Sequence, residues 1–226
     1  MERTIVVGDI HGCREELEEI VQLCDFRPGN RLVLAGDLVA KGPDSPGVLA
    51  RAREWGALAV LGNHDAHVLR LHRVKGLPDD GREVKAEHQL VVNQLHHDDW
   101  DYLMKLPYFL RLGSETPGVP ETAVVHAGAV PGIPLDEQDP EHLITLRSIK
   151  DNGEPTKKLK GHPWASLWTG PERLIFGHDA IRGLQEHPMA TGLDTGCVYG
   201  GKLTAIILPE RRIVSVAAKR AYVSLT

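Results

Sequence analysis

Five short apolar runs, each ending in a side chain that can bind a metal ion, constrain this chain more than any other feature. They are TIVVGDIHG (4–12), RLVLAGD (31–37), LAVLGNHD (58–65), TAVVHAG (122–128) and RLIFGHD (173–179). Continuous runs of this length are typical of strands that are buried on both faces of a largely parallel sheet. In open sheets of this kind, ligands bind beyond the carboxyl ends of the strands. We therefore expect the polar residues that follow these runs to gather in one place.

The side chains at these strand ends have the ligand chemistry of a pair of metal ions. They are Asp9, His11, Asp37, Asn63, His126 and His178. We expect one ion at Asp9, His11 and Asp37, and a second at Asp37, Asn63, His126 and His178. Mixed nitrogen and oxygen ligands suit Mn²⁺, Fe, Co²⁺ or Zn²⁺ better than Ca²⁺. Two ions roughly 3.5–4 Å apart can share a bridging hydroxide and bind phosphoryl oxygens, so we predict hydrolysis of a phosphate ester or anhydride.

Further residues near these strand ends are candidates for catalysis and substrate binding. His64 follows Asn63 and is the natural general acid for the leaving group, a role worth about 10²–10⁴-fold in rate. Asp65, next to His64, is the second candidate for a catalytic residue, although neighbouring side chains on a helix point in different directions. Lys41 and Arg147 are candidates to bind substrate phosphate, as a point charge and a bidentate fork. Five other histidines fit no metal motif, and we interpret them as surface or packing residues: His67, His72, His88, His96 and His97.

Helical spacing and turn residues organise the rest of the chain. We expect helices at 14–24 and 46–55 between the first strands, and a helical cap at about 64–106. The cap would contain helices at 83–95 and 98–106, with a turn at 76–81. Segment 113–121 is predicted as a loop and 150–163 as a polar, mobile connection. Strands at 202–208 and 212–218 would follow, all within one α/β domain covering 1–226.

Composition narrows the class of protein. The 226 residues are 42% hydrophobic and 25% charged, as in ordinary globular proteins. A net charge of −5 argues against extended contact with a nucleic-acid backbone. No apolar run is long enough to cross a bilayer, and we expect no signal or transit segment. Three cysteines without CxxC spacing argue against a disulfide framework or a zinc ribbon, so we expect reduced thiols in the cytoplasm.

The motifs, in chain order, resemble those of the calcineurin-like metallophosphoesterases of the phosphoprotein-phosphatase superfamily. The motifs are GDIHG (8–12), GDLVAKGP (36–43), GNHD (62–65), HAG (126–128) and GH (177–178). Segment LDTGCVYGGKLTAI (193–206) is similar to the C-terminal motif of ApaH and ApaH-like phosphatases. The resemblance implies a metallophosphoesterase sandwich of two mixed β-sheets flanked by helices, with the dinuclear site between the sheets. It also implies an enzyme that hydrolyses dinucleoside polyphosphates, cleaving diadenosine tetraphosphate to two ADP. The metal ion would be Mn²⁺, Co²⁺ or Mg²⁺.

The resemblance also bears on residues around the predicted ligands. By motif position, Arg147 matches a phosphate-binding arginine and Tyr199 a tyrosine that lines the site. Lys41 stands where an arginine is more usual. Protein phosphatases have an aspartate at the position of Ala40, where it orients the catalytic histidine, so the resemblance leaves open what orients His64.

Two other functions fit the same motifs. A protein phosphatase (Ser/Thr/Tyr) on this scaffold would act on phosphoproteins. A binding module for alarmone nucleotides with weak catalysis would act as a sensor. The complete ligand set and His64 argue against the binding module, and GNHD (62–65) in place of GNHE distinguishes the chain from typical Ser/Thr protein phosphatases.

Overall fold

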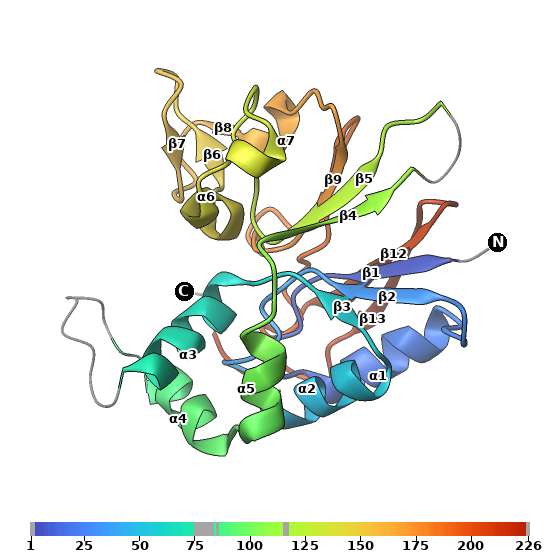
Figure 1. The fold of residues 1–226 in the computed structure, drawn as a ribbon, viewed down its shortest axis with the longest axis vertical. Coiled ribbons are helices and arrows are strands. Elements are labelled where there is room, and N and C mark those ends of the chain that lie inside the picture. Colours follow the sequence, from blue (N-terminus) through green and yellow to red (C-terminus); the bar gives the residue numbers. More distant parts are fainter. Residues whose placement is uncertain (1–2, 75–83, 85, 115–117, 225–226) are drawn as a thin grey trace.

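The protein is described by a computed structural model, which covers residues 3–74, 84, 86–114 and 118–224. Within these ranges the chain forms two five-stranded sheets and one three-stranded sheet (Figure 1). The sandwich of two mixed sheets flanked by helices, implied by the resemblance, is confirmed. In the same described ranges, none of the helices has the length and apolar character needed to traverse a bilayer.

The first sheet carries the early strand–helix alternation. Its order is β13-β12-β1-β2-β3. The strands are β1 (Thr4–Val7), β2 (Arg31–Leu34), β3 (Leu58–Ala59), β12 (Lys202–Leu208) and β13 (Arg212–Ala217). β1, β2 and β3 are parallel, whereas β12 pairs antiparallel with both β1 and β13. The carboxyl ends of the three parallel strands therefore point the same way.

The second sheet has the same mixed character. Its order is β10-β11-β9-β5-β4. The strands are β4 (Phe109–Gly113), β5 (Thr122–Val125), β9 (Arg173–Phe176), β10 (Gln185–His187) and β11 (Ala190–Gly192). β5, β9 and β11 run parallel, and β4 and β10 are antiparallel edge strands. The predicted parallel pairing is thus found in β1, β2 and β3 of the first sheet, where β3 is an edge strand, and in the three inner strands of the second sheet.

An apolar layer joins the two sheets. Val6 and Val33 of the first sheet share one buried cluster with Val124 and Ile175 of the second. Side chains alternate across a strand, so the neighbours of Val6 face the opposite way, into the core below the helices. Both faces of β1 are therefore buried, which explains its uninterrupted apolar sequence.

Helices cover the outer faces of the sandwich (Figure 1). α1 (Arg14–Leu23) and α2 (Ser45–Glu54) pack on the first sheet, close to the predicted ranges. The side chain of Asp44 caps α2 by accepting a hydrogen bond from the amide of Gly47. A 3-10 turn (Leu135–Glu137), α6 (Pro140–Thr145) and α7 (Trp164–Leu167) cover the second sheet.

The predicted helical cap is present beside the first sheet. It comprises α3 (Asn63–Arg73), α4 (Ala86–Gln94) and α5 (His97–Leu103), the last two being shorter than expected. Val68, Val91 and Leu103 from the three helices belong to the same buried core as α1 and α2. The predicted turn at 76–81 lies outside the described residues.

The segment 150–163, predicted as a polar, mobile connection, contains part of a small sheet that the sequence-based prediction missed. Two short strands in this segment, β7 (Pro155–Thr156) and β8 (His162–Pro163), flank β6 (Ser148–Ile149) in the three-stranded sheet. The Arg147 amide also donates to the Thr156 carbonyl at 3.0 Å. Two-residue strands with half-buried or exposed side chains leave no alternating apolar pattern, so backbone hydrogen bonds order the segment without a signature in its sequence.

Truncation of Ile175 tests the layer between the sheets. Ile175→Ala should lower the free energy of unfolding by about 2–4 kcal/mol, because a buried cavity replaces the side chain. Denaturant unfolding followed by circular dichroism measures this change. Ile181→Ala is the matched control, since Ile181 is 55% exposed and should change the free energy by less than about 0.5 kcal/mol. Equal losses in the two variants would contradict the proposed layer.

Candidate metal centre

The loops that follow the parallel strands of both sheets bring the predicted site residues together. Asp9 and His11 follow β1, Asp37 follows β2, His126 follows β5 and His178 follows β9. A single pocket is lined by most of the predicted residues. They are Asp9, His11, Asp37, Lys41, Asn63, His64, Arg147, His178 and Tyr199. The remaining ligand, His126, is fully buried and contacts Asn63.

Three predicted ligands have a left-handed backbone. The φ angle is 49° at His11, 49° at Asp37 and 69° at His178. This region is costly for residues other than glycine, and such outliers cluster at functional sites. A hydrogen bond of 2.8 Å from the His11 amide to the Asp37 carbonyl ties two of these strand-end loops together. The surrounding fold thus holds these residues in conformations that they would otherwise avoid.

Two glycines allow the carboxylates to approach the backbone. A Cβ atom on Gly62 would overlap Oδ1 of Asp37, and one on Gly177 would overlap Oδ1 of Asp9. The glycines before Asn63 and His178 are therefore required by close packing around the two carboxylates.

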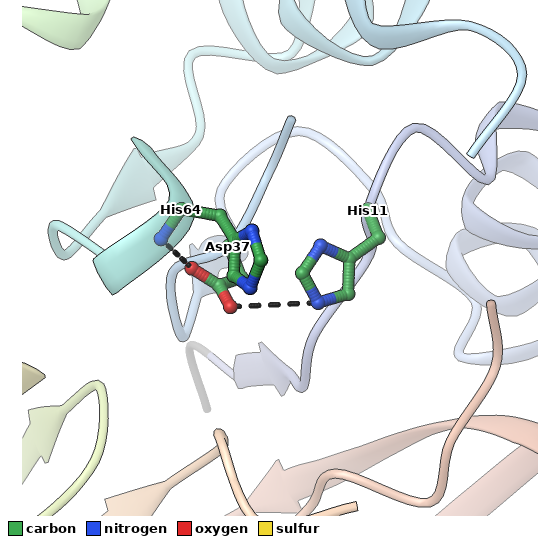
Figure 2. Close-up of side chains that lie close together, drawn as sticks. All are labelled: His11, Asp37 and His64. Atoms are coloured by element: carbon green, nitrogen blue, oxygen red, sulfur yellow. Dashed lines mark hydrogen bonds and ion pairs between the residues drawn. The ribbon is translucent and has the colours of Figure 1, made fainter. Parts of the chain in front are cut away.

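Each of these carboxylates is anchored through one oxygen. Oδ1 of Asp37 accepts a hydrogen bond from the His64 amide at 2.8 Å, and Oδ1 of Asp9 accepts one from the His178 amide at 2.9 Å. The other Asp37 oxygen, Oδ2, lies 3.4 Å from Nε2 of His11 and 3.5 Å from Nε2 of His126. Figure 2 shows the Asp37 carboxylate between the backbone of His64 and the ring of His11. One carboxylate oxygen thus faces imidazoles from both sheets.

Backbone carbonyls orient two of the imidazoles. Nδ1 of His11 lies 3.3 Å from the Val39 carbonyl, and Nδ1 of His126 lies 2.8 Å from the Ala35 carbonyl. A carbonyl can only accept, so Nδ1 carries the hydrogen in both rings. Nε2 then carries the lone pair, on the side of Oδ2 of Asp37 in both rings, which is the arrangement usual for metal-binding histidines.

Acceptor atoms of two imidazoles that lack a hydrogen-bond donor indicate a cation at this position. Nε2 of His126 lies 3.0 Å from Oδ1 of Asn63, so two acceptors face each other. Nε2 of His178 is buried and has no hydrogen-bond partner among the described residues. A buried acceptor left in this way is costly unless something binds it. The predicted ligand set therefore suits divalent metal ions.

The grouping of donor atoms agrees with two ions that share Asp37. One group of close donor atoms contains Asp37, His126 and His178, and another contains His11, Asp37 and His64. The second group includes His64, which the sequence assigns to proton transfer, and does not include Asp9. Oδ2 of Asp9 nevertheless lies 4.0 Å from Nε2 of His11, at the edge of the same group.

Burial sets the protonation of the site. It lowers the pKa of His126 to about 4 and holds the pKa of His11 well below its usual value. Burial also raises the pKa of Asp37 to about 6. For Asp9, burial and then the charges of Asp194 and Asp37 raise the pKa. Neutral imidazoles are ready to bind metal, and divalent ions would stabilise the crowded carboxylates in their charged form.

Asp194 is a site residue that the sequence-based prediction missed. It is buried, it lines the pocket, and burial raises its pKa to about 6. Its Oδ1 accepts a hydrogen bond from the Gly196 amide at 3.0 Å. The only sequence signal was its place in the LDTGC segment, because Asp194 does not follow one of the five apolar runs.

His88 also differs from its interpretation as a surface or packing residue. Its Nε2 lies 2.8 Å from Nδ1 of His64, and the residue is 3% exposed. Burial, followed by the charge of His11 and then that of Lys41, lowers the pKa of His64. Two of the other histidines keep their predicted roles: His72 stacks on Trp100, and the His97 side chain is 84% exposed.

Asp65, the second predicted catalytic residue, is buried and bound to the backbone of two segments. Its carboxylate accepts hydrogen bonds from the amides of Leu38, Val39 and Gly62, at 2.9, 3.2 and 3.1 Å. It therefore ties the loop after β2 to the start of α3. These contacts give Asp65 a role in shaping the loop, and its predicted catalytic role stays a prediction.

The predicted substrate-binding residues lie around the same pocket. Nζ of Lys41 lies 3.1 Å from Nε2 of His11 and donates to the Tyr199 hydroxyl at 2.9 Å. Nη2 of Arg147 donates to the His178 carbonyl at 3.0 Å. Two cationic side chains and a phenol thus lie beside the candidate metal ligands, and an anion that enters the pocket would contact them.

Comparisons with known proteins agree with this geometry. The family model for calcineurin-like phosphoesterases matches residues 2–207. A symmetrical bis(5'-nucleosyl)-tetraphosphatase from Methylobacillus flagellatus is 32% identical over 94% of this chain and 94% of its own length. The asymmetrical bis(5'-nucleosyl)-tetraphosphatase PrpE from Oceanobacillus iheyensis is 26% identical over 97% of this chain and 94% of its own length.

A solved structure gives the same result. A crystal structure of a proposed diadenosine tetraphosphatase has a TM-score of 0.85 and 41% sequence identity, and the match covers 96% of this chain and 94% of that one. Sequence motifs, fold and relatives all agree. The chain belongs to the calcineurin-like phosphoesterase family, and it is a hydrolase.

Proposed function

We propose that this enzyme hydrolyses dinucleoside polyphosphates at a dinuclear metal site, with diadenosine tetraphosphate cleaved to two ADP. The observation that carries the proposal is the position of Asp37 Oδ2, at 3.4 and 3.5 Å from imidazole nitrogens of His11 and His126. A carboxylate oxygen placed in this way is suited to bridge two cations. Bridged metal pairs are common in phosphatases.

We assign the ligands to two ions as in the sequence-based prediction. Asp9, His11 and Asp37 would hold one divalent ion, and Asp37, Asn63, His126 and His178 would hold the other. When bound, such a pair supplies an activated water and neutralises charge on the phosphoryl group. The mixed nitrogen and oxygen set favours Mn²⁺, with Co²⁺, Mg²⁺, Fe or Zn²⁺ as alternatives.

The chain's own side chains account for the other steps. We assign His64 as the general acid, which gives the proton on Nε2 to the leaving oxygen of ADP while Nδ1 remains hydrogen-bonded to His88. Lys41 and Arg147 would bind the phosphate chain, and Tyr199 would hold Lys41 in place through its hydroxyl.

The relatives support a small-molecule substrate. Relatives that match this chain over nearly their whole length are named symmetrical and asymmetrical bis(5'-nucleosyl)-tetraphosphatases. They do not support a phosphoprotein substrate. A sensor with weak catalysis is disfavoured by the complete ligand set and by the burial that keeps the imidazoles neutral. We favour symmetrical cleavage because the LDTGC segment resembles that of ApaH.

Two proposals concern the chain as a whole. Residues 1–226 would work as one domain, since the cap helices and the first sheet share one buried core. The three cysteines are buried and free, as expected in a reducing compartment, and we propose that the enzyme acts in the cytoplasm.

Product analysis tests the substrate. The protein is incubated with diadenosine tetraphosphate or a phosphopeptide in Mn²⁺, and the products are separated by chromatography. ADP as the sole nucleotide product is the expected result. AMP plus ATP would replace symmetrical by asymmetrical cleavage, and phosphate released only from the peptide would overturn the proposal.

Asp37→Asn tests the shared ligand. This variant removes the charge between the two imidazole groups, so Mn²⁺ binding should weaken by more than the ~10–100-fold typical of an outer partner. Equilibrium dialysis with metal analysis measures the affinity. Asp151→Asn, on a side chain that is 92% exposed, is the matched control and should bind like the wild type. Unchanged binding by Asp37→Asn would remove Asp37 from the site.

His64→Asn tests the general acid. The variant should retain both metal ions, because the backbone amide that anchors Asp37 is unchanged. Turnover should fall by about 10²–10⁴-fold. Metal content and steady-state kinetics on the same preparation separate the two effects, and full turnover would exclude His64 from proton transfer.

A further inference from the structure

We propose that His88 is the positioning residue for His64, and that it takes over the orienting task for which position 40 offers no acid. The proposal rests on the proposed function, because it gives His64 the role of general acid. The resemblance leaves the orientation of His64 open, since it implies an acid at position 40 and Ala40 has only a methyl group there. The helical cap supplies the missing partner.

The contact between the two rings is direct and nearly coplanar. Nε2 of His88 lies 2.8 Å from Nδ1 of His64, and the ring planes differ by 14°. The centroids lie 5.0 Å apart, so the rings meet along their edges, as an N–H···N hydrogen bond requires. An imidazole that is not held can rotate about its Cβ–Cγ bond, and this contact fixes that rotation.

His88 is itself held in place. The residue is 3% exposed and sits on α4, in the packed cap. The ring of His67, from α3, lies against it with centroids 4.3 Å apart. Nδ1 of His88 lies 3.9 Å from a carboxylate oxygen of Glu87. Two helices and a nearby carboxylate therefore set the position of the ring that contacts His64.

The same contact decides which nitrogen of His64 reacts. In its acid form His64 carries hydrogen on both nitrogens, and Nδ1–H donates to Nε2 of His88. The Nε2–H bond then breaks, its hydrogen passes as a proton to the leaving oxygen, and its electron pair stays on Nε2. Asp65, the acid nearest in sequence, is already bonded to three backbone amides, so it is not placed to do this.

Variants of His88 with substrates of different leaving groups test the proposal. His88→Phe keeps an aromatic ring without the hydrogen bond, and His88→Gln keeps an amide near the position of Nε2. His88→Phe should lower kcat on phenyl phosphate and on diadenosine tetraphosphate by about 10–100-fold, with little change in KM. Hydrolysis of 2,4-dinitrophenyl phosphate should stay within about twofold, because its leaving group needs no proton. His88→Gln should recover most of the loss.

A double-variant cycle with His64→Asn separates positioning from packing. If His88 acts through His64, His88→Phe should cost less than about twofold in the His64→Asn background. His97→Gln on the neighbouring helix is the matched control, since that histidine is exposed, and should behave like the wild type. Equal losses from His88→Phe on both aryl phosphates, or additive losses in the double variant, would overturn the proposal.

A spectroscopic measurement tests the hydrogen bond between His64 and His88 without measuring turnover. In ¹⁵N-labelled protein loaded with diamagnetic Mg²⁺, the wild type should show nitrogen–nitrogen coupling across the hydrogen bond between Nδ1 of His64 and Nε2 of His88. His88→Gln should lack this coupling while its circular dichroism and metal content stay unchanged. Absence of the coupling in the wild type would contradict the proposal. Aryl phosphatase activity without cleavage of diadenosine tetraphosphate would refute the proposed substrate and leave the His88 test intact.

Discussion

The carboxylate of Asp37 is held on one side by the backbone of α3 and faces imidazoles of both sheets on the other. Its Oδ1 accepts the His64 amide, while Oδ2 lies between His11 and His126. This arrangement requires that the end of β2, the start of α3 and the end of β5 meet at one point. The apolar layer of Val33, Val124 and their neighbours brings these three points together, because it packs one sheet against the other.

Precision at the site comes from strained backbone that is held by its surroundings. His11, Asp37 and His178 all have positive φ, and hydrogen bonds between the strand-end loops offset this cost. Asp65 contributes by binding the amides of Leu38 and Val39 just beyond Asp37. A site built on loops thereby gains the rigidity of the sheets, which is what ligands for a metal pair need.

Residues whose roles depend on strand ends could be predicted from the sequence. An apolar run followed by a polar residue predicts both the strand and the place of that residue at its end, so the sequence could predict that the six candidate ligands lie close together. His88 and Asp194 lie outside that pattern. His88 reaches His64 through helix packing, and Asp194 reaches the pocket through a turn; such tertiary contacts leave no local periodicity. The sheet at 148–163 was missed for a similar reason, since backbone hydrogen bonds alone order it.

If two metal ions share the Asp37 carboxylate, as we propose, they are neighbours, and electron paramagnetic resonance of the Mn²⁺-loaded protein detects this directly. Two Mn²⁺ ions that share Asp37 would be magnetically coupled, so the spectrum at two equivalents of Mn²⁺ per chain should be the multiline pattern of a coupled pair. A simple six-line spectrum that only grows in intensity between one and two equivalents would mean separate ions, and would contradict the assignment of Asp37 as the bridge.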